Sequence, residues 1–281
     1  MQLVAIDVEG LGSITATRIA FGHLTVLAGT ESYAGDVVTA LELLQAAAHG
    51  EIRATLAGEV TRTNGAQSRL VLAARFEGLA YRLAMRMPSR HETELGIGPM
   101  MLSEHVTADE LGRERIILER RGAGIWLRDA EGWPRTMPRR LEAGETALSV
   151  VRAVGQLARL DTMRKAMRSW RIRKEPALAK VATSPAAAVP FPFGRDDHGD
   201  SSNGMPRLMV FAGAATAGSP PSMLASIIWR AANQAQVVVT ATSPQLLEHL
   251  DSKRFPDAVF HHARMSRGRR RATTARAASD H

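Results

Sequence analysis

Alternation of apolar and polar residues predicts that the first half of the chain is rich in strands. The period-two pattern covers residues 3–8 and 14–20, and the continuous apolar run 24–28 is typical of a strand buried on both faces. From 55 to 129 the pattern stays mostly period two and is broken by turn signals such as Asn64-Gly65. We therefore expect a buried strand followed by an antiparallel meander.

Helical spacing of apolar residues appears in two places. Residues 37–48 follow it, with Asp36 placed to cap the first turn and Gly50 placed to end the helix. Residues 142–170 return to it, with leucine and valine on one face and arginine on the other, which indicates an amphipathic helix.

The C-terminal part is predicted to be an α/β unit that follows a linker. Residues 175–204 concentrate Pro, Ala, Ser, Gly and Asp, a composition typical of a flexible connection. Beyond it, strand-like and helix-like stretches alternate at 207–212, 221–235, 236–240 and 244–250. This order predicts parallel strands joined by helical crossovers.

The composition places the chain among globular proteins and excludes several classes of site. Its 281 residues are 45% hydrophobic and 23% charged, and none is cysteine, so neither disulfides nor thiolate metal sites are possible. No N-terminal signal pattern and no apolar run of roughly 18 to 20 residues is present. We expect a cytoplasmic protein without a membrane segment.

The formal net charge of +8 is concentrated between 152 and 174 and in the tail 264–281. Such basic stretches either contact an anionic partner or are simply solvated, and the first alternative predicts a nucleic-acid surface. Its residues would be Arg152, Arg159, Arg164, Lys165, Arg168 and Arg171.

Several segments resemble the RecF/SMC-like ABC ATPases, in the order in which that family carries them. Residues 21–29 read Phe-Gly-His-Leu-Thr-Val-Leu-Ala-Gly, which is similar to the strand that leads into the family's phosphate-binding loop. Residues 147–149 and 167–171 resemble an Ala-Leu-Ser and a Leu-Arg-Ser-Trp-Arg segment of a small stand-alone branch of predicted ATPases in this group. Residues 236–244 resemble Gln-Val-Ile-Val-Thr-Thr-His-Ser-Pro.

This resemblance implies an α/β fold of the P-loop NTPase type, as in an ABC ATPase head, with a mixed sheet, an antiparallel β meander and a helical insertion. The implied segments are a P-loop-like lobe with the meander (1–141), a basic amphipathic helical segment (142–174), a linker in place of the signature region (175–205), a βαβα unit like the Walker B and H-loop region (206–262) and a basic disordered tail (263–281).

The phosphate-binding loop is degenerate. A working loop reads Gly-x-x-x-x-Gly-Lys-Ser/Thr, because backbone N–H groups cradle the phosphates, the lysine reaches their oxygens and the hydroxyl holds Mg²⁺. Counted without a gap, Ala34, Gly35 and Asp36 replace the second glycine, the lysine and the hydroxyl, and Glu31 adds a second carboxylate. The predicted positions of this degenerate cofactor site are Gly29, Thr30, Glu31, Ser32, Tyr33, Ala34, Gly35 and Asp36.

The remaining catalytic groups are missing as well. No carboxylate lies between 204 and 236, where the Walker B acids belong, and the histidine of the H-loop corresponds to Thr242. The degenerate catalytic positions are Gly213, Ala214, Thr216 and Thr242. We expect no catalytic residue, no metal site at the adjacent pair His261-His262, whose side chains we expect to face solvent, and no cofactor, unless ATP and Mg²⁺ still use the degenerate site.

The leading hypothesis is a pseudo-ATPase that acts as a structural or regulatory subunit of a DNA-repair or phage-defence assembly. Its partner would be a second copy of the chain or an intact ATPase. Three alternatives remain open at this stage: an ATP-binding subunit that is active only with an intact partner, a basic nucleic-acid-binding protein, and a decaying gene product.

Overall fold

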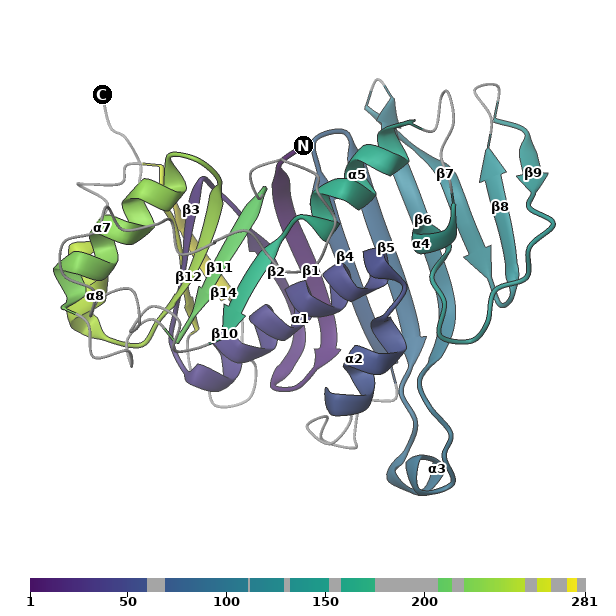
Figure 1. Cartoon of the computed structure of the whole chain (residues 1–281), viewed down its shortest axis with the longest axis horizontal. Helices are drawn as coiled ribbons and strands as arrows, with labels where there is room; N and C mark the ends of the chain where they lie inside the picture. Colours follow the sequence, from purple (N-terminus) through teal and green to yellow (C-terminus); the bar gives the residue numbers. More distant parts are fainter. Residues whose placement is uncertain are drawn as a thin grey trace, which may run out of the picture. The chain divides into compact units, whose positions relative to one another are not determined.

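The computed structural model describes residues 1–59, 69–110, 112–128, 132–151, 158–174, 207–213, 220–250, 257–263 and 272–276 (Figure 1). They form two compact units. Unit 1 comprises residues 1–20 and the described part of 36–168, and unit 2 comprises 21–35 and the described residues from 169 onward. Within the described residues, no helix combines the length and the apolar character needed to cross a bilayer.

Unit 1 is built on an eight-stranded antiparallel sheet with the order β2-β1-β4-β5-β6-β7-β8-β9. From β4 onward each strand pairs with the next one along the chain, which is the predicted meander. The strands are β1 (Leu3–Leu11), β2 (Ile14–Ala20), β4 (Arg69–Phe76), β5 (Leu79–Arg86), β6 (Met100–Glu110), β7 (Arg113–Arg121), β8 (Gly124–Arg128) and β9 (Pro134–Thr136).

The core of unit 1 lies between this sheet and its helices. Cross-strand neighbours such as Leu72 and Leu83, or Ala74 and Tyr81, are buried on the same face. Figure 1 shows α1, α2, α4 and α5 over one face of the sheet. The helices are α1 (Glu31–His49), whose first five residues belong to unit 2, α2 (Ile52–Glu59), α3 (Arg90–Glu94), α4 (Ala147–Val150) and α5 (Ala158–Arg168).

Unit 2 is built on a six-stranded sheet with the order β10-β11-β12-β3-β13-β14, parallel except for the pair β13 and β14. Every residue of β3 and β12 is buried, as their continuous apolar runs predict. The strands are β3 (Leu24–Ala28), β10 (Arg171–Lys174), β11 (Leu208–Ala212), β12 (Gln236–Ala241), β13 (Val259–Ala263) and β14 (Ala272–Arg276).

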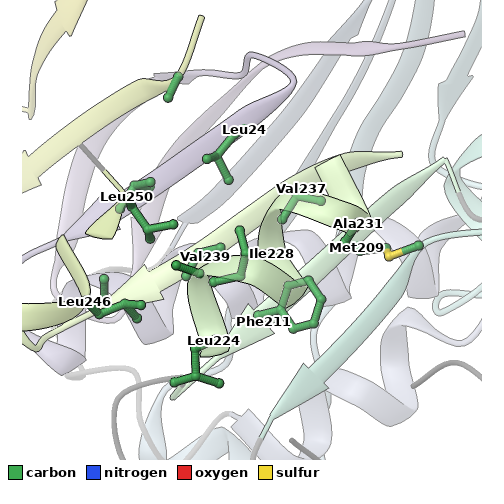
Figure 2. Close-up of a cluster of buried hydrophobic side chains, with 14 residues drawn as sticks. Leu24, Met209, Phe211, Leu224, Ile228, Ala231, Val237, Val239, Leu246 and Leu250 are labelled. Carbon is green, nitrogen blue, oxygen red and sulfur yellow. The ribbon is translucent and has the colours of Figure 1, made fainter. Parts of the chain in front are cut away.

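Among the described residues from 169 onward, unit 2 has the helices α7 (Pro221–Ala232) and α8 (Pro244–His249). Figure 2 shows the cluster in which Leu224 and Ile228 of α7 join Phe211 of β11 and Val239 of β12. The helix spacing of the α7 residues and the full burial of the strands explain why this part of the chain folds as an α/β layer.

The predicted fold class, an α/β protein with parallel pairing and an antiparallel meander, is confirmed, although the meander and the parallel strands occupy separate sheets. Local boundaries differ in several places. Residues 55–59 continue α2 instead of starting a strand, and 171–174 form β10 because they pair with β11. Part of the expected disordered tail, 272–276, forms β14 against β13. The expected linker 175–205 lies outside the described residues.

Asp36 does not cap α1, which begins five residues earlier. It lies inside the helix, and its Oδ2 accepts hydrogen bonds from the backbone N–H and the Oγ of Ser13, both at 2.6 Å. Gly12 makes this approach possible, because its φ is +53° and a Cβ there would lie 2.2 Å from Oδ1 of Asp36. The carboxylate therefore fastens α1 to the turn between β1 and β2.

Replacing Gly12 by alanine should destabilise the protein by about 2 kcal/mol or more, because it combines left-handed backbone strain with the clash against Asp36. Gly122→Ala is the matched control, since Gly122 has a φ of +58° and no atom within 4 Å of an added Cβ. Urea denaturation of both variants separates the two contributions. Equal losses for Gly12→Ala and Gly122→Ala would contradict the Asp36 contact.

Candidate functional site

The carboxyl ends of three parallel strands bring the predicted site segments of unit 2 to one edge of its sheet. In the ladder Val239 of β12 pairs with Phe211 of β11 and with Val26 of β3. Gly213, Thr242 and Gly29 follow these strands at their carboxyl ends. In open α/β sheets this edge is where ligands bind. Two further predicted positions, Ala214 and Thr216, lie outside the described residues.

The connection from β3 to α1 is too short to be a phosphate-binding loop. Only Gly29, with a φ of +142°, and Thr30 separate the strand from the helix. The Oγ1 of Thr30 accepts a hydrogen bond from the N–H of Tyr33 at 3.4 Å, and the carbonyl of Thr30 accepts one from Ala34 at 3.2 Å. The N–H groups from Ala34 onward are therefore donors inside the helix and cannot cradle a polyphosphate.

The side chains of residues 31–36 include no cation that could bind a phosphate. Glu31 and Ser32 are exposed, whereas Tyr33 and Ala34 are buried. Glu31 lies in the first turn of α1, where its charge is favourable for the helix and repels a phosphate. Asp36, the last of the predicted positions, is engaged with Ser13 in unit 1.

Gly35 is a helical residue in this structure. It lies in α1, it is exposed, and a Cβ added to it would meet no atom within 4 Å. Nothing in the surroundings therefore requires a glycine at this position, in contrast to Gly12.

The end of β11 is held by a hydrogen bond to β12. Gly213 has a φ of +74°, and its N–H donates to the Oγ1 of the buried Thr240 at 2.8 Å. No Asp or Glu occurs in the described residues 207–213 and 220–235. Thr242 is exposed, and no group of three His, Asp or Glu side chains among the described residues is arranged to hold a metal ion.

The two adjacent histidines of β13 point to opposite faces, as neighbours in a strand do. His262 is exposed and pairs in register with Ala28 at the end of β3. His261 is fully buried, so the expectation that both face solvent is wrong for this residue.

The predicted nucleic-acid residues are divided between the two units, and several are engaged within the protein. Arg171 is in β10 of unit 2, Arg152 lies outside the described residues, and the other four are in α5 of unit 1. Their partners are as follows: Arg164 and Lys165 both pair with Asp161, Arg164 also donates to the carbonyl of Val151, Arg168 donates to the carbonyl of Ala48, and Arg159 donates to that of Gly78.

These contacts give α5 a structural role. The hydrogen bond from Lys165 and the charge of Arg164 hold the pKa of Asp161 below its usual range. Arg168 reaches the last turn of α1, where a cation stabilises the free carbonyls, and Gln45 of α1 donates back to the carbonyl of Arg168 at 3.3 Å.

Unit 1 contains a buried polar cluster that the sequence patterns did not predict. Glu104 of β6 is fully buried and accepts hydrogen bonds from Tyr81 Oη (3.0 Å) and from the backbone N–H groups of Ala147 (2.6 Å) and Leu148 (2.9 Å). These two residues open α4, within the segment that resembles Ala-Leu-Ser. The available signal was a carboxylate at an inward position of β6, in phase with the buried Val106 and Ala108.

Arg120, opposite Glu104 in the ladder, completes the cluster. It is 2% exposed and donates to the carbonyls of Gly122, Glu142 and Glu145. The connection that leads into α4 is thus fixed from both neighbouring strands.

The charge state of Glu104 reflects opposing effects. Burial raises the pKa of this carboxyl, and the amides of Leu148 and Ala147, the Tyr81 hydroxyl and the Arg120 charge offset part of the increase. Burial and the neighbouring Glu104 also raise the pKa of Tyr81.

Comparison with known proteins gave distant structural neighbours only. No family model and no curated protein matches this chain. An SMC head domain from Thermotoga maritima has a TM-score of 0.42 and 10% identity and covers 98% of this chain and 99% of its own. An SMC head crystallised with the C-winged helix domain of ScpA has a TM-score of 0.44 and 8% identity, with 98% of each chain covered.

Replacing Glu104 by glutamine should destabilise the protein by about 1 to 3 kcal/mol, because an amide cannot accept all three hydrogen bonds. It should also flatten the pH dependence. Above the ordinary glutamate pKa the folded chain keeps a proton that the unfolded chain has lost, so wild-type stability falls as pH rises through the window up to the raised pKa.

Urea denaturation between pH 4.5 and 7 measures this slope, which for one proton is at most about 1.4 kcal/mol per pH unit. Glu77→Gln, at an exposed turn, is the matched control for the loss of a carboxyl group. Parallel pH profiles for Glu104→Gln and the wild type would show that Glu104 does not titrate in this range.

Proposed function

We propose that this chain is a degenerate relative of the RecF/SMC-like ABC ATPases, a pseudo-ATPase that serves as a structural or regulatory subunit without hydrolysing ATP. The observation that carries the proposal is the start of α1 at Glu31, which leaves no loop where the phosphates of a nucleotide would lie. The segments that resemble the family follow β3, β11 and β12 at one edge of the parallel sheet. A fold can keep such an arrangement after the residues of the active site have been lost.

The energetics support the absence of turnover. A single oxyanion donor is worth about 2.7 to 4 kcal/mol of transition-state stabilisation. At this edge the phosphate-binding lysine and the hydroxyl of the loop are replaced by Gly35 and Asp36, and the H-loop histidine by Thr242. Losses of this size, added together, remove the rate enhancement on which an ATPase depends.

The proposal places the protein in a cytoplasmic assembly with a second copy of itself or with an intact ATPase. The resemblance to RecF/SMC-like proteins suggests DNA repair or phage defence as the setting. Direct nucleic-acid binding by α5 receives less support, because Arg164, Lys165 and Arg168 already have partners within unit 1.

Gly35→Ala should stabilise the protein by about 1 kcal/mol, because glycine is unfavourable in a helix interior and the added methyl group meets no atom. Thermal and urea denaturation measure the gain. A phosphate-binding loop at 31–36 would give the opposite result, since the position would then not be helical. Destabilisation by Gly35→Ala would therefore contradict the helical assignment and weaken the proposal.

Neither the wild type nor Gly35→Lys should be stabilised by Mg-ATP or hydrolyse it. A ligand at a hundred times its Kd adds about 2.7 kcal/mol to stability, so even weak binding is detectable as a rise in Tm at millimolar nucleotide. Gly35→Lys restores the charge of the missing lysine at an exposed position, and Gly35→Ala is its control for helix propensity. Turnover by Gly35→Lys, or a nucleotide-dependent rise in Tm of several degrees in the wild type, would overturn the proposal.

A further inference from the structure

A buried carboxylate binds the first turn of α4. Glu104 of β6 accepts hydrogen bonds from the backbone N–H groups of Ala147 and Leu148, at 2.6 and 2.9 Å, and one from the hydroxyl of Tyr81 at 3.0 Å. These four residues are at most 2% exposed, so water does not compete for the hydrogen bonds. The sheet thus holds α4 through the side chain of Glu104.

The N-cap residue of α4 binds the end of α1. Thr146 Oγ1 donates to the carbonyl of Ala47 at 2.6 Å and accepts a hydrogen bond from the N–H of Ser149 at 3.3 Å. Ser149 in turn packs against Gly50, which follows α1, and its Oγ lies 3.0 Å from the position of a Cβ on that glycine. The first turn of α4 therefore connects the sheet to the last turn of α1.

These side-chain contacts stabilise α4 because the helix is short. It has four residues, and the N–H of Val151 closes it by donating to the carbonyl of Ala147 at 3.0 Å. A helix of one turn is unstable by itself, since few hydrogen bonds compensate for the fixed backbone angles. Weakening the contact with Glu104 therefore loosens α4 before it affects the pairing of the strands.

Ionisation of Glu104 opposes this contact. Burial disfavours the charged carboxylate and raises the pKa of Glu104, although the amides of α4, Tyr81 and Arg120 favour the charge. When α4 opens, water reaches the carboxylate and its pKa returns to the ordinary range. The closed form therefore holds the proton more tightly, and a rise in pH favours the open form.

Glu104 is the group of this cluster that titrates near neutral pH. Burial raises the pKa of Tyr81 well above its usual value, so its hydroxyl stays protonated, and the Arg120 guanidinium keeps its charge. Residues 147–150 of α4 carry no titratable side chain. The titratable and charged neighbours are, by element, Tyr81 of β5, Arg120 of β7, Glu142 and Glu145 of the connection into α4, whose carbonyls accept from Arg120, and the exposed His49 at the end of α1.

We propose that Glu104 is a pH-sensitive latch for α4, which keeps α4 on the sheet when its carboxyl group is protonated and lets α4 open when the group is ionised. Opening also separates α4 from the end of α1, because Thr146 and the amides bound by Glu104 belong to the same turn. The latch lies within unit 1 and does not depend on whether unit 2 binds a nucleotide.

Hydrogen exchange of the full-length protein between about pH 5 and 8, read by mass spectrometry in peptides that span residues 141–151, tests the latch. After correction for intrinsic rates, protection should fall by up to about tenfold per pH unit, the limit for the release of one proton. It should also stay below the protection of β4 and β5, since α4 opens while these strands remain paired. Glu104→Gln should keep a constant protection factor over the same range.

Two further variants separate titration from a purely structural role. Tyr81→Phe removes one donor to the carboxylate and leaves Glu104 in place, so the fall in protection should begin at a higher pH than in the wild type. Thr146→Val removes the hydrogen bond to Ala47 and should lower protection equally at every pH, with the slope unchanged. Circular dichroism and Tm establish that each variant is folded, and the Tyr81→Phe shift tests the latch should Glu104→Gln fail to fold.

The outcomes decide the proposal in both directions. A fall in protection with pH in the wild type that is absent from Glu104→Gln, or that Tyr81→Phe moves to higher pH, supports the latch. Protection of residues 141–151 that is constant with pH in the wild type, or that falls equally in Glu104→Gln, overturns it. So does equal protection of α4 and of β4 and β5, because α4 would then open only when the whole unit unfolds.

Discussion

Helix α1 begins two residues after β3, and the chemistry of unit 2 depends on that starting point. Beyond its first turn a helix uses its own carbonyls to satisfy its N–H groups, so the residues from Ala34 onward no longer have free N–H donors for a phosphate. Thr30 directly precedes the helix, and its Oγ1 accepts a hydrogen bond from the N–H of Tyr33 in the first turn. A carboxylate, Glu31, then occupies the first turn, which suits the helix and not an anionic ligand.

Polar side chains in or beside the predicted ligand-binding segments serve the fold. Asp36 fastens α1 to the β1–β2 turn through Ser13, and Thr240 holds the end of β11 through Gly213. Arg168 satisfies a carbonyl in the last turn of α1. Each of these side chains forms a hydrogen bond with a partner in the same unit in place of water, and this hydrogen bond stabilises the fold.

The polar side chains around Glu104 also serve the fold, in a fully buried position. A carboxylate in a fully buried position is costly unless donors surround it, and here Tyr81 and two amides of α4 supply them. Arg120 adds three contacts to backbone carbonyls on the way into α4.

The sequence by itself determined the pattern of elements: period-two alternation predicted the meander, and predominantly apolar runs predicted β3, β11 and β12, because both are properties of single segments. It also showed that residues 29–36 do not carry the Gly-x-x-x-x-Gly-Lys-Ser/Thr pattern, since the lack of a lysine in a segment needs no coordinates. Only the tertiary structure decided where α1 starts, that 171–174 pair as β10 and that Asp36 meets Ser13, because these depend on partners distant in the chain. The same holds for Glu104 and Arg120, whose hydrogen-bond partners come from strands and loops that sequence spacing does not bring together.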